Sequence, residues 1–318
     1  MKRPRQRSTP AGEHRPVLLD EVLAALDPKP GQVVVDTTVG WAGHSAELLR
    51  RVGPSGRLVG IDFDPDNLPR ARERLDVIGY PFSLHHGNFA GLQTVLAAEG
   101  ITAVDAVLAD LGMSSMQVDD AERGFSYARD GPLDMRMDRS RGRTAAQLLA
   151  TISEDDLRQA LHDLGDEPEA ARVAQAIVRA RQSALIERTA DLARIIREAT
   201  ESDPKRPWRL HPQPGQWNLH PAARTFQALR ILVNRELANL EQLLRVLPAV
   251  LKPGGRAVII SFHSGEDRLV KAAFRDGMKA GVYGRTAADP IRARFEERTA
   301  NPRSRSAKLR WAERARSK

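Results

Sequence analysis

Short apolar runs alternate with helix-like stretches along the first hundred residues of the chain. The runs with strand character are Gln32–Asp36, Arg57–Asp62, Pro81–His86 and Asp105–Asp110. Between them, residues such as Ala42–Val52 and Phe89–Glu99 have the character of helices. Strands that alternate with helices at this spacing predict a parallel sheet with helices on both faces.

The pattern changes in the middle of the chain. From about Ser115 to Thr200 no segment has convincing strand character. Capping-box patterns begin at Thr144 and Ser153, and apolar residues at helical spacing follow them. This pattern predicts a helical insertion, which a proline-rich linker at residues 205–217 connects back to the first domain.

Strand and helix patterns return after the linker. Apolar residues from Phe226 to Leu244 keep a 3–4 spacing, which predicts one long amphipathic helix. Lys252–Gly255 is predicted to be a turn, Ala257–Phe262 a fifth strand and Lys308–Ala312 a final strand. We therefore expect three parts, namely a basic disordered arm at 1–13, a discontinuous α/β domain at 14–114 and 217–318, and a helical domain with its linker at 115–216.

Composition narrows the class of protein. No apolar run approaches the ~20 residues that span a bilayer, and the basic N-terminus lacks the apolar core of a signal peptide. These features predict a cytoplasmic protein with no membrane partner. The chain has no cysteine, which excludes disulfides, cysteine-ligated zinc and a cysteine nucleophile.

The net charge of +8 is concentrated at the two ends of the chain. Residues 1–15 carry a balance of +4 and residues 285–318 a balance of +7, around a body that is close to neutral. Such a distribution favours a polyanionic partner, nucleic acid first. A solubilising tail is the alternative.

A glycine turn and a carboxylate suggest a nucleoside cofactor. Gly40 and Gly43 follow the first strand, and Asp62 ends the second, where an acid can accept hydrogen bonds from ribose hydroxyls. The glycine pair alone is weak, since it also suits an ordinary βα turn. Trp41 would crowd a pyrophosphate, so the turn favours S-adenosylmethionine over a dinucleotide.

Further polar residues follow the later strands. Asp110 ends the fourth strand and leads into a glycine and serine turn, a suitable place to hold a substrate amine. His263 ends the fifth strand, where a substrate role and a structural hydrogen bond are equally expected. Ser114 could contact substrate or cap a turn. His85 and His86 lack a third ligand at metal spacing, so no metal site is expected.

Six ordered motifs, from about His14 to Arg314, are those of a known family. They are Asp36-x-Thr-x-Gly-x-x-Gly-His-Ser45, Asp110-Leu-Gly-x-Ser-Ser115, Arg123-Gly-Phe-Ser126, Gly131-Pro-Leu-Asp-Met-Arg-Met-Asp138, Arg224-Thr-Phe-Gln-Ala-Leu-Arg-Ile231 and Ser261-Phe-His-Ser264. The chain thus resembles the small-subunit (16S) ribosomal RNA (cytosine-N4)-methyltransferases, the MraW/RsmH family.

The resemblance implies a class I (Rossmann-like) S-adenosylmethionine-dependent methyltransferase with an inserted all-helical domain that recognises substrate. It implies methylation of a cytosine N4 amine in the decoding region of 16S ribosomal RNA, within the small ribosomal subunit. The cofactor residues that it implies are Gly40, Ala42, Gly43 and His44 in the turn, Asp62 at the ribose, Phe89 at the adenine, and Asp110 and Gln117 near the methionine part.

An RNA substrate also gives the basic C-terminal residues a role. We expect Arg303, Arg305, Lys308 and Arg310 to contact RNA phosphates. The absence of cysteine disfavours methylation at cytosine C5, which normally needs a covalent cysteine adduct.

The sequence departs from the family pattern in three places. Trp41-Ala42 replaces the usual Arg-Gly, Met116 replaces the usual proline before Gln117, and the segment 205–217 is longer than usual. An amino-methyltransferase for another RNA or DNA is the nearest alternative. A non-catalytic ribosome assembly factor that retains the fold is the second. The sequence leaves the oligomeric state open, a homodimer included.

Overall fold

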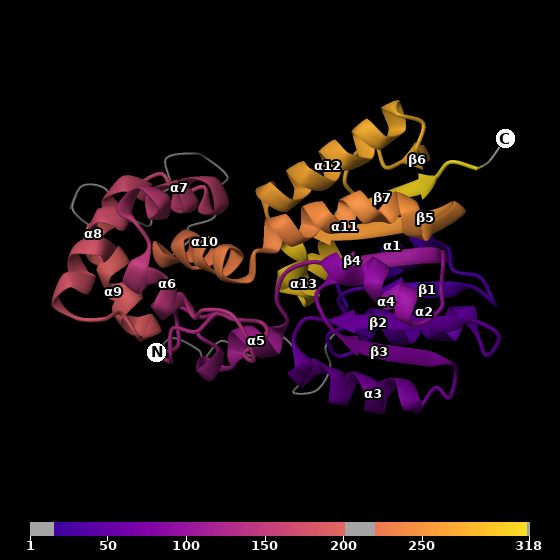
Figure 1. Ribbon diagram of the computed structural model, residues 1–318, viewed down its shortest axis with the longest axis horizontal. Helices are drawn as coiled ribbons and strands as arrows, with labels where there is room; N and C mark the ends of the chain where they lie inside the picture. The colour runs from indigo at the N-terminus through magenta and orange to yellow at the C-terminus, as the bar shows by residue number, and fades with distance from the viewer. Residues whose placement is uncertain (1–15, 201–219, 317–318) are drawn as a thin grey trace. The chain divides into compact units, whose positions relative to one another are not determined.

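The computed structural model describes residues 16–200 and 220–316 (Figure 1). The predicted N-terminal arm at 1–13 and the linker at 205–217 therefore lie outside the described residues. The described chain divides into two compact units. The sheet unit comprises the residues up to Gly112 and from Leu237 onward, and the helical unit comprises Met113–Glu236.

A seven-stranded sheet forms the centre of the sheet unit, in the order β3-β2-β1-β4-β5-β7-β6. Its strands are β1 (Val33–Asp36), β2 (Arg57–Asp62), β3 (Phe82–His86), β4 (Val104–Asp110), β5 (Leu251–Ser261), β6 (Tyr283–Thr286) and β7 (Lys308–Arg314). The first five are parallel, whereas β7 is antiparallel to β5 and β6 to β7. The five predicted parallel strands and the final strand are confirmed; β6, which has little apolar pattern, was not predicted.

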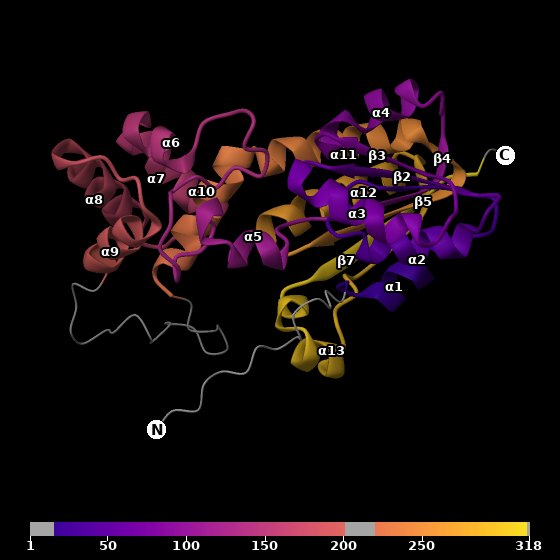
Figure 2. The same cartoon turned by 90° about the horizontal axis from the view of Figure 1, so that it is seen from below.

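Helices cover both faces of this sheet, as expected (Figure 2). One face packs against α1 (Leu19–Leu26), α2 (Gly43–Val52) and α3 (Leu68–Asp76). The other packs against α4 (Leu92–Ala98), α11 (Glu236–Val250) and α12 (Ser264–Lys279). The short 3-10 helices η1 (Pro65–Asn67) and η2 (Phe89–Gly91) lead into α3 and α4. The predicted Rossmann-like fold is confirmed.

The predicted turn at Lys252–Gly255 lies inside β5. The register with β4 shifts there, because Leu251 pairs with Val104 and Arg256 with Ala106. Gly254 has a φ of 77°, which glycine adopts without a steric penalty. The turn residues thus form an irregularity at the start of the strand.

The helical unit has an apolar core of its own. Its elements are α5 (Ser115–Asp119), η3 (Ala121–Arg123), α6 (Ala145–Thr151), α7 (Glu154–Gly165), α8 (Ala170–Ser183), α9 (Thr189–Thr200) and α10 (Ala222–Asn234). Thr144 and Ser153 accept hydrogen bonds from the backbone of Gln147 and Asp156, so both predicted N-caps are confirmed. The predicted helical insertion is present.

The prediction of one long helix from Phe226 to Leu244 is wrong. Helix α10 ends at Asn234, and Arg235 adopts a φ of 52° before α11 begins. The apolar face of α10 belongs to the core of the helical unit, and that of α11 to the core of the sheet unit. The helical unit therefore extends to Glu236, beyond the boundary expected at residue 216.

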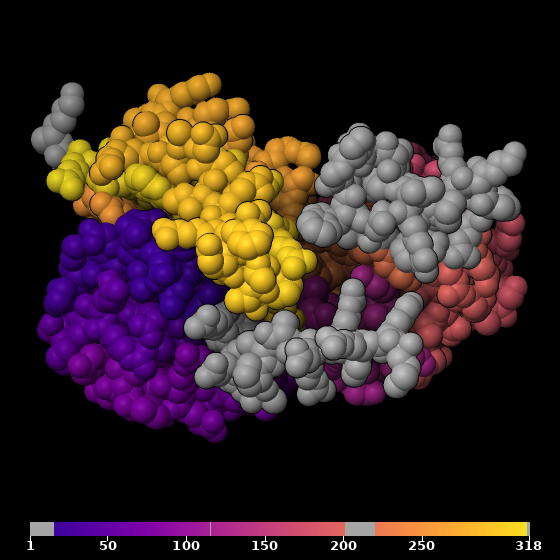
Figure 3. All heavy atoms as spheres, turned by 180° about the vertical axis from the view of Figure 1, so that it is seen from behind, coloured from indigo at the N-terminus to yellow at the C-terminus, as the bar shows by residue number. Residues whose placement is uncertain are grey.

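The chain makes an excursion between β6 and β7 before it ends. It contains α13 (Phe295–Ala300) and η4 (Pro302–Arg305) and lies on the surface of the sheet unit, in yellow in Figure 3. Glu297 accepts a hydrogen bond from the backbone N–H of Leu18 at 2.8 Å, which ties the excursion to the start of α1. Of the helices described, none combines the length and the apolar character that a membrane span requires.

Candidate active site

The carboxyl ends of β1, β2 and β4 bring the predicted polar residues of the sheet unit together. The turn after β1 has a left-handed backbone at Gly40 and at Ala42, with φ values of 53° and 58°. Ala42 is the N-cap of α2 and has no exposed surface. A side chain at position 43 would meet Pro16, because a Cβ there would lie 2.8 Å from Pro16 Cγ. Packing against Pro16 therefore requires glycine at position 43, whereas the left-handed backbone favours glycine at position 40.

Asp62 connects this turn to the end of β2. Its Oδ2 accepts the Gly40 N–H at 2.6 Å, and its Oδ1 accepts the Asp64 N–H at 2.8 Å and the Asn67 amide at 3.1 Å. Burial raises the pKa of Asp62 to about 6, although these hydrogen bonds oppose the rise. A buried carboxylate thus lies where the sequence predicted an acceptor for ribose hydroxyls.

Asp110 has an incompletely satisfied carboxylate at the end of β4. Its backbone N–H donates to Thr38 Oγ1 at 2.6 Å, which fixes the strand end against the turn. Its Oδ1 is buried and has no hydrogen-bond partner among the described residues. Burial raises the pKa of Asp110 well above its usual range, and the charges of Asp36 and Glu266 raise it further. A donor or a cation beside this carboxylate would offset the cost of its burial.

His44 presents a second acceptor to the same place. Its Nε2 lies 2.9 Å from the carbonyl oxygen of Val17, and since a carbonyl only accepts, Nε2 carries the proton. Burial lowers the pKa of His44 to about 4, so the ring is neutral and Nδ1 is an acceptor. That Nδ1 lies 3.6 Å from Asp110 Oδ2. Two acceptors thus converge, an arrangement suited to a ligand with several N–H donors.

Asp36 is a buried acid of the first motif whose role in the site was not predicted. Its Oδ2 accepts from Ser45 Oγ at 2.6 Å and its Oδ1 from the Thr38 N–H at 3.1 Å. Burial raises the pKa of Asp36, and its charge contributes to the rise at Asp110. The signal was its place at the end of β1, the position that drew attention to Asp62 and Asp110 on their strands.

Other predicted residues have structural contacts. His263 is the N-cap of α12, with Nε2 3.3 Å from Glu266 Oε1. Ser114 and Gln117 form a capping box at α5 in the helical unit, which satisfies the structural expectation for Ser114. Phe89 begins η2, in the loop where the Gly87 N–H donates to the Asp62 carbonyl at 2.9 Å. None of these contacts tests a cofactor or substrate role.

The C-terminal basic residues do not form one exposed set. Arg310 is 5% exposed, and its Nε lies 2.7 Å from Asp267 Oδ1. Lys308 points to the same carboxylate at 3.0 Å, because residues 308 and 310 share one face of β7. Burial and pairing with Asp267 leave Arg310 little surface for a phosphate, and Lys308 already has a carboxylate partner, so their phosphate role stays a prediction. Arg305 is exposed and Arg303 is half-buried, so the phosphate role expected for them stays a prediction.

Comparison with known proteins identifies the family of this chain. The model of the MraW methylase family matches residues 11–315. The ribosomal RNA small subunit methyltransferase H of Geobacter sp. (strain M21) is 47% identical over 94% of this chain and 98% of its own length. The protein of that name from Acidobacterium capsulatum is 42% identical over 94% and 98%.

A solved structure described as a putative rRNA-methylase from Clostridium thermocellum covers 94% of each chain at 12% identity, with a TM-score of 0.43. The evidence for the family comes from the sequence matches, which extend over nearly the whole chain and confirm the family that the six motifs indicated. This chain belongs to the MraW methylase family.

Proposed function

We propose that the protein transfers a methyl group from S-adenosylmethionine to the N4 amine of a cytosine in small-subunit (16S) ribosomal RNA. Relatives that match nearly the whole chain are named ribosomal RNA small subunit methyltransferase H. The observation that carries the proposal is the convergence of Asp110 and His44 on one buried place at the end of β4.

The residues at the strand ends fit this cofactor. The Asp110 carboxylate and the His44 Nδ1 offer acceptors to its ammonium group, and a cation there would restore the charged form of Asp110. Asp62 offers a carboxylate to the ribose hydroxyls. Gly40, Ala42 and Gly43 offer backbone groups, whereas Phe89 and Gln117 are assigned to the adenine and the methionine part by family pattern.

When bound, S-adenosylmethionine supplies a methyl group activated by its sulfonium. The chain must then orient a poor nucleophile, since the lone pair of a cytosine amine is delocalised into the ring. An acceptor on the amine hydrogens would strengthen the nucleophile and stabilise the positive charge that develops on nitrogen. Asp110 or the Leu111 carbonyl is the candidate for that acceptor. The family pattern favours Asp110 acting only on the cofactor, in which case the Leu111 carbonyl takes this role. Ser114 and His263 remain weaker candidates for substrate contact.

The target base has to leave its stack to reach such a site, so single-stranded or loop RNA is the expected substrate form. Arg303 and Arg305 would contact RNA phosphates and position the substrate without reading its sequence. A ribosomal RNA substrate also supports the predicted cytoplasmic location. Light scattering would measure the oligomeric state, for which a homodimer is one alternative.

The deciding experiment is methyl transfer from labelled S-adenosylmethionine to unmethylated small ribosomal subunits and to bare ribosomal RNA, followed by nucleoside mass spectrometry. We expect N4-methylcytidine at one position. Transfer only to another RNA or to DNA would favour an amino-methyltransferase that acts on that nucleic acid. Absence of both transfer and cofactor binding would favour an assembly factor, and the altered Trp41-Ala42 turn is the feature that motivates that comparison.

A further inference from the structure

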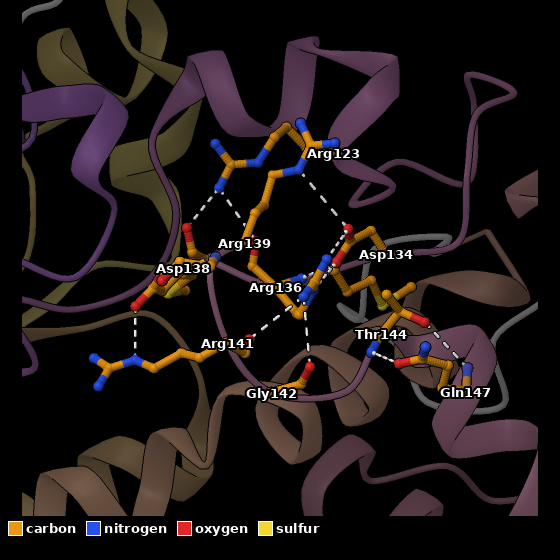
Figure 4. Close-up of polar contacts among 12 residues, drawn as sticks. Arg123, Asp134, Arg136, Asp138, Arg139, Arg141, Gly142, Thr144 and Gln147 are labelled. Carbon is orange, nitrogen blue, oxygen red and sulfur yellow. Dashed lines mark hydrogen bonds and ion pairs between the residues drawn. The ribbon is translucent and has the colours of Figure 1, made fainter.

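Two buried carboxylates organise a loop of the helical unit. The side chains of Asp134 and Asp138 are 8% and 1% exposed. Arg136 donates to Asp134 through Nε at 2.7 Å and through Nη2 at 2.9 Å, and this arrangement lowers the pKa of Asp134 (Figure 4). Asp138 Oδ1 accepts from the N–H and the hydroxyl of Ser140. Both acids are therefore buried and hold polar or charged partners inside the protein.

The backbone of this loop is fixed from neighbouring elements. The side-chain amide of Asn234, at the end of α10, accepts from the Met137 N–H and donates to the Met135 carbonyl, each at 2.8 Å. Arg123 Nη2 donates to the Met137 carbonyl at 2.8 Å. Met135 has a φ of 63° and is fully buried. Such an unfavourable backbone conformation persists only where the surroundings hold it.

Three arginines follow at alternate positions and extend to the surface. Arg139 is 49% exposed, with Nε 3.8 Å from Asp134 Oδ2, and Arg141 is 60% exposed, with Nε 2.6 Å from Asp138 Oδ2. The exposed Arg143 donates to the Gln147 carbonyl and to Thr151 Oγ1. A guanidinium has five N–H donors, so it can hold such a partner and a phosphate at the same time.

These pairs differ from other arginine pairs of the helical unit. Other arginines of the unit lie three residues after an exposed carboxylate, namely Arg158 after Asp155, Arg172 after Glu169 and Arg194 after Asp191. Those pairs place both charges in solvent. In the loop the acids are buried and the guanidinium groups are outside, so the surface of the loop carries the positive charge.

We propose that Arg139, Arg141 and Arg143, here called the arginine loop, form a preordered surface that binds phosphates of the RNA backbone. The proposal rests on the function proposed above and adds a substrate contact in the helical unit. Arginine suits this task because its planar fork matches phosphate oxygens. The contacts with Asp138, Gln147 and Thr151 restrict Arg141 and Arg143 before RNA arrives, which lowers the entropy that binding costs.

The test uses the full chain with Arg139→Gln/Arg143→Gln. This variant retains Arg136 beside Asp134 and Arg141 beside Asp138, so both buried acids keep a partner. Affinity for bare small-subunit ribosomal RNA is measured at several salt concentrations. Loss of two phosphate contacts should raise Kd on the order of tenfold and reduce the slope of log K against log salt by roughly 1.4 to 1.8.

The matched control is Arg158→Gln/Arg194→Gln, which removes the same charge from exposed helix positions of the same unit. Its Kd and salt slope should stay near those of the wild type. Equal slopes of log K against log salt in the two double variants would overturn the proposal that the arginine loop binds phosphates. A wild-type enzyme that binds RNA but makes no N4-methylcytidine would overturn the proposed reaction alone. Cofactor affinity, measured by calorimetry, should be unchanged in both variants.

Discussion

Asp110 is the residue whose carboxylate has a buried oxygen, Oδ1, without a hydrogen-bond partner among the described residues. Replacement Asp110→Asn keeps the size of the side chain but removes the charge that would face the cofactor's ammonium group. A charge-assisted hydrogen bond contributes about 1.5–3 kcal/mol, so cofactor affinity should fall at least tenfold. Isothermal titration with S-adenosylmethionine measures this change.

The control for this prediction is Asp105→Asn, at the opposite end of the same strand, where the carboxylate accepts from the Val33 N–H and pairs with Lys252. Its cofactor affinity should equal that of the wild type. Unchanged affinity in Asp110→Asn together with lost turnover would transfer the role of Asp110 from the cofactor to the substrate amine.

Ala42 gives a second prediction at this scale. A left-handed backbone costs a non-glycine residue about 1–2 kcal/mol, whereas the buried methyl group of Ala42 contributes about 0.8 kcal/mol. Ala42→Gly should therefore change the free energy of unfolding by less than about 1 kcal/mol. The equally buried Ala46 lies inside α2, so Ala46→Gly should cost about 2 kcal/mol. Urea denaturation measures the free energy of unfolding of both variants. Equal losses of stability in Ala42→Gly and Ala46→Gly would contradict the strain assigned to the turn.

Among the elements, the break between α10 and α11 separates two apolar faces. That of α10 packs in the core of the helical unit and that of α11 in the core of the sheet unit. Arg235 is exposed and has a φ of 52°, a conformation that glycine adopts without strain. Arg235→Gly should leave stability unchanged or raise it by up to about 1 kcal/mol.

Arg245 provides the comparison, because it is exposed and lies within α11. Arg245→Gly should cost about 1 kcal/mol, the usual penalty for glycine inside a helix. Both values come from urea denaturation. A similar loss in the two variants would indicate one continuous helix, as the apolar spacing from Phe226 to Leu244 predicted.

The elements also differ in how well the sequence predicts them. The central strands are continuous apolar runs that end in a carboxylate, so their ends and the residues there were predicted closely. Strand β6 lies at the edge of the sheet with exposed residues, and its short sequence carries little strand pattern. The 3–4 spacing of apolar residues from Phe226 to Leu244, in turn, does not show where one helix ends and the next helix, which packs in a different core, begins.

For the molecule as a whole, Asp62 and His44 make the free energy of unfolding depend on pH in opposite directions over nearly the same pH range. The folded pKa of Asp62 is raised from 3.8 to about 6, so its contribution is lost as pH rises through 6. The folded pKa of His44 is lowered from 6.5 to about 4, so its contribution is lost as pH falls through 4. Each corresponds to about 3 kcal/mol, at about 1.4 kcal/mol per pKa unit.

Urea denaturation between pH 4 and pH 7 separates these two contributions. Relative to the wild type, Asp62→Asn should gain stability as pH rises through this range, since it lacks the group that loses a proton there. His44→Gln should lose relative stability over the same range, since it lacks the group whose neutral form is favoured by folding. Parallel pH profiles for all three proteins would contradict the assigned protonation states.

Local periodicity and the chemistry of short motifs were enough to predict the alternation of strands and helices, the insertion, and the acids at the ends of β2 and β4. Which side chains become partners follows only from the folded chain. Folding buried Arg310 against Asp267, broke the long helix at Arg235 and brought His44 to Asp110. The physical reason is that burial and pairing depend on residues distant along the chain, which no local pattern records.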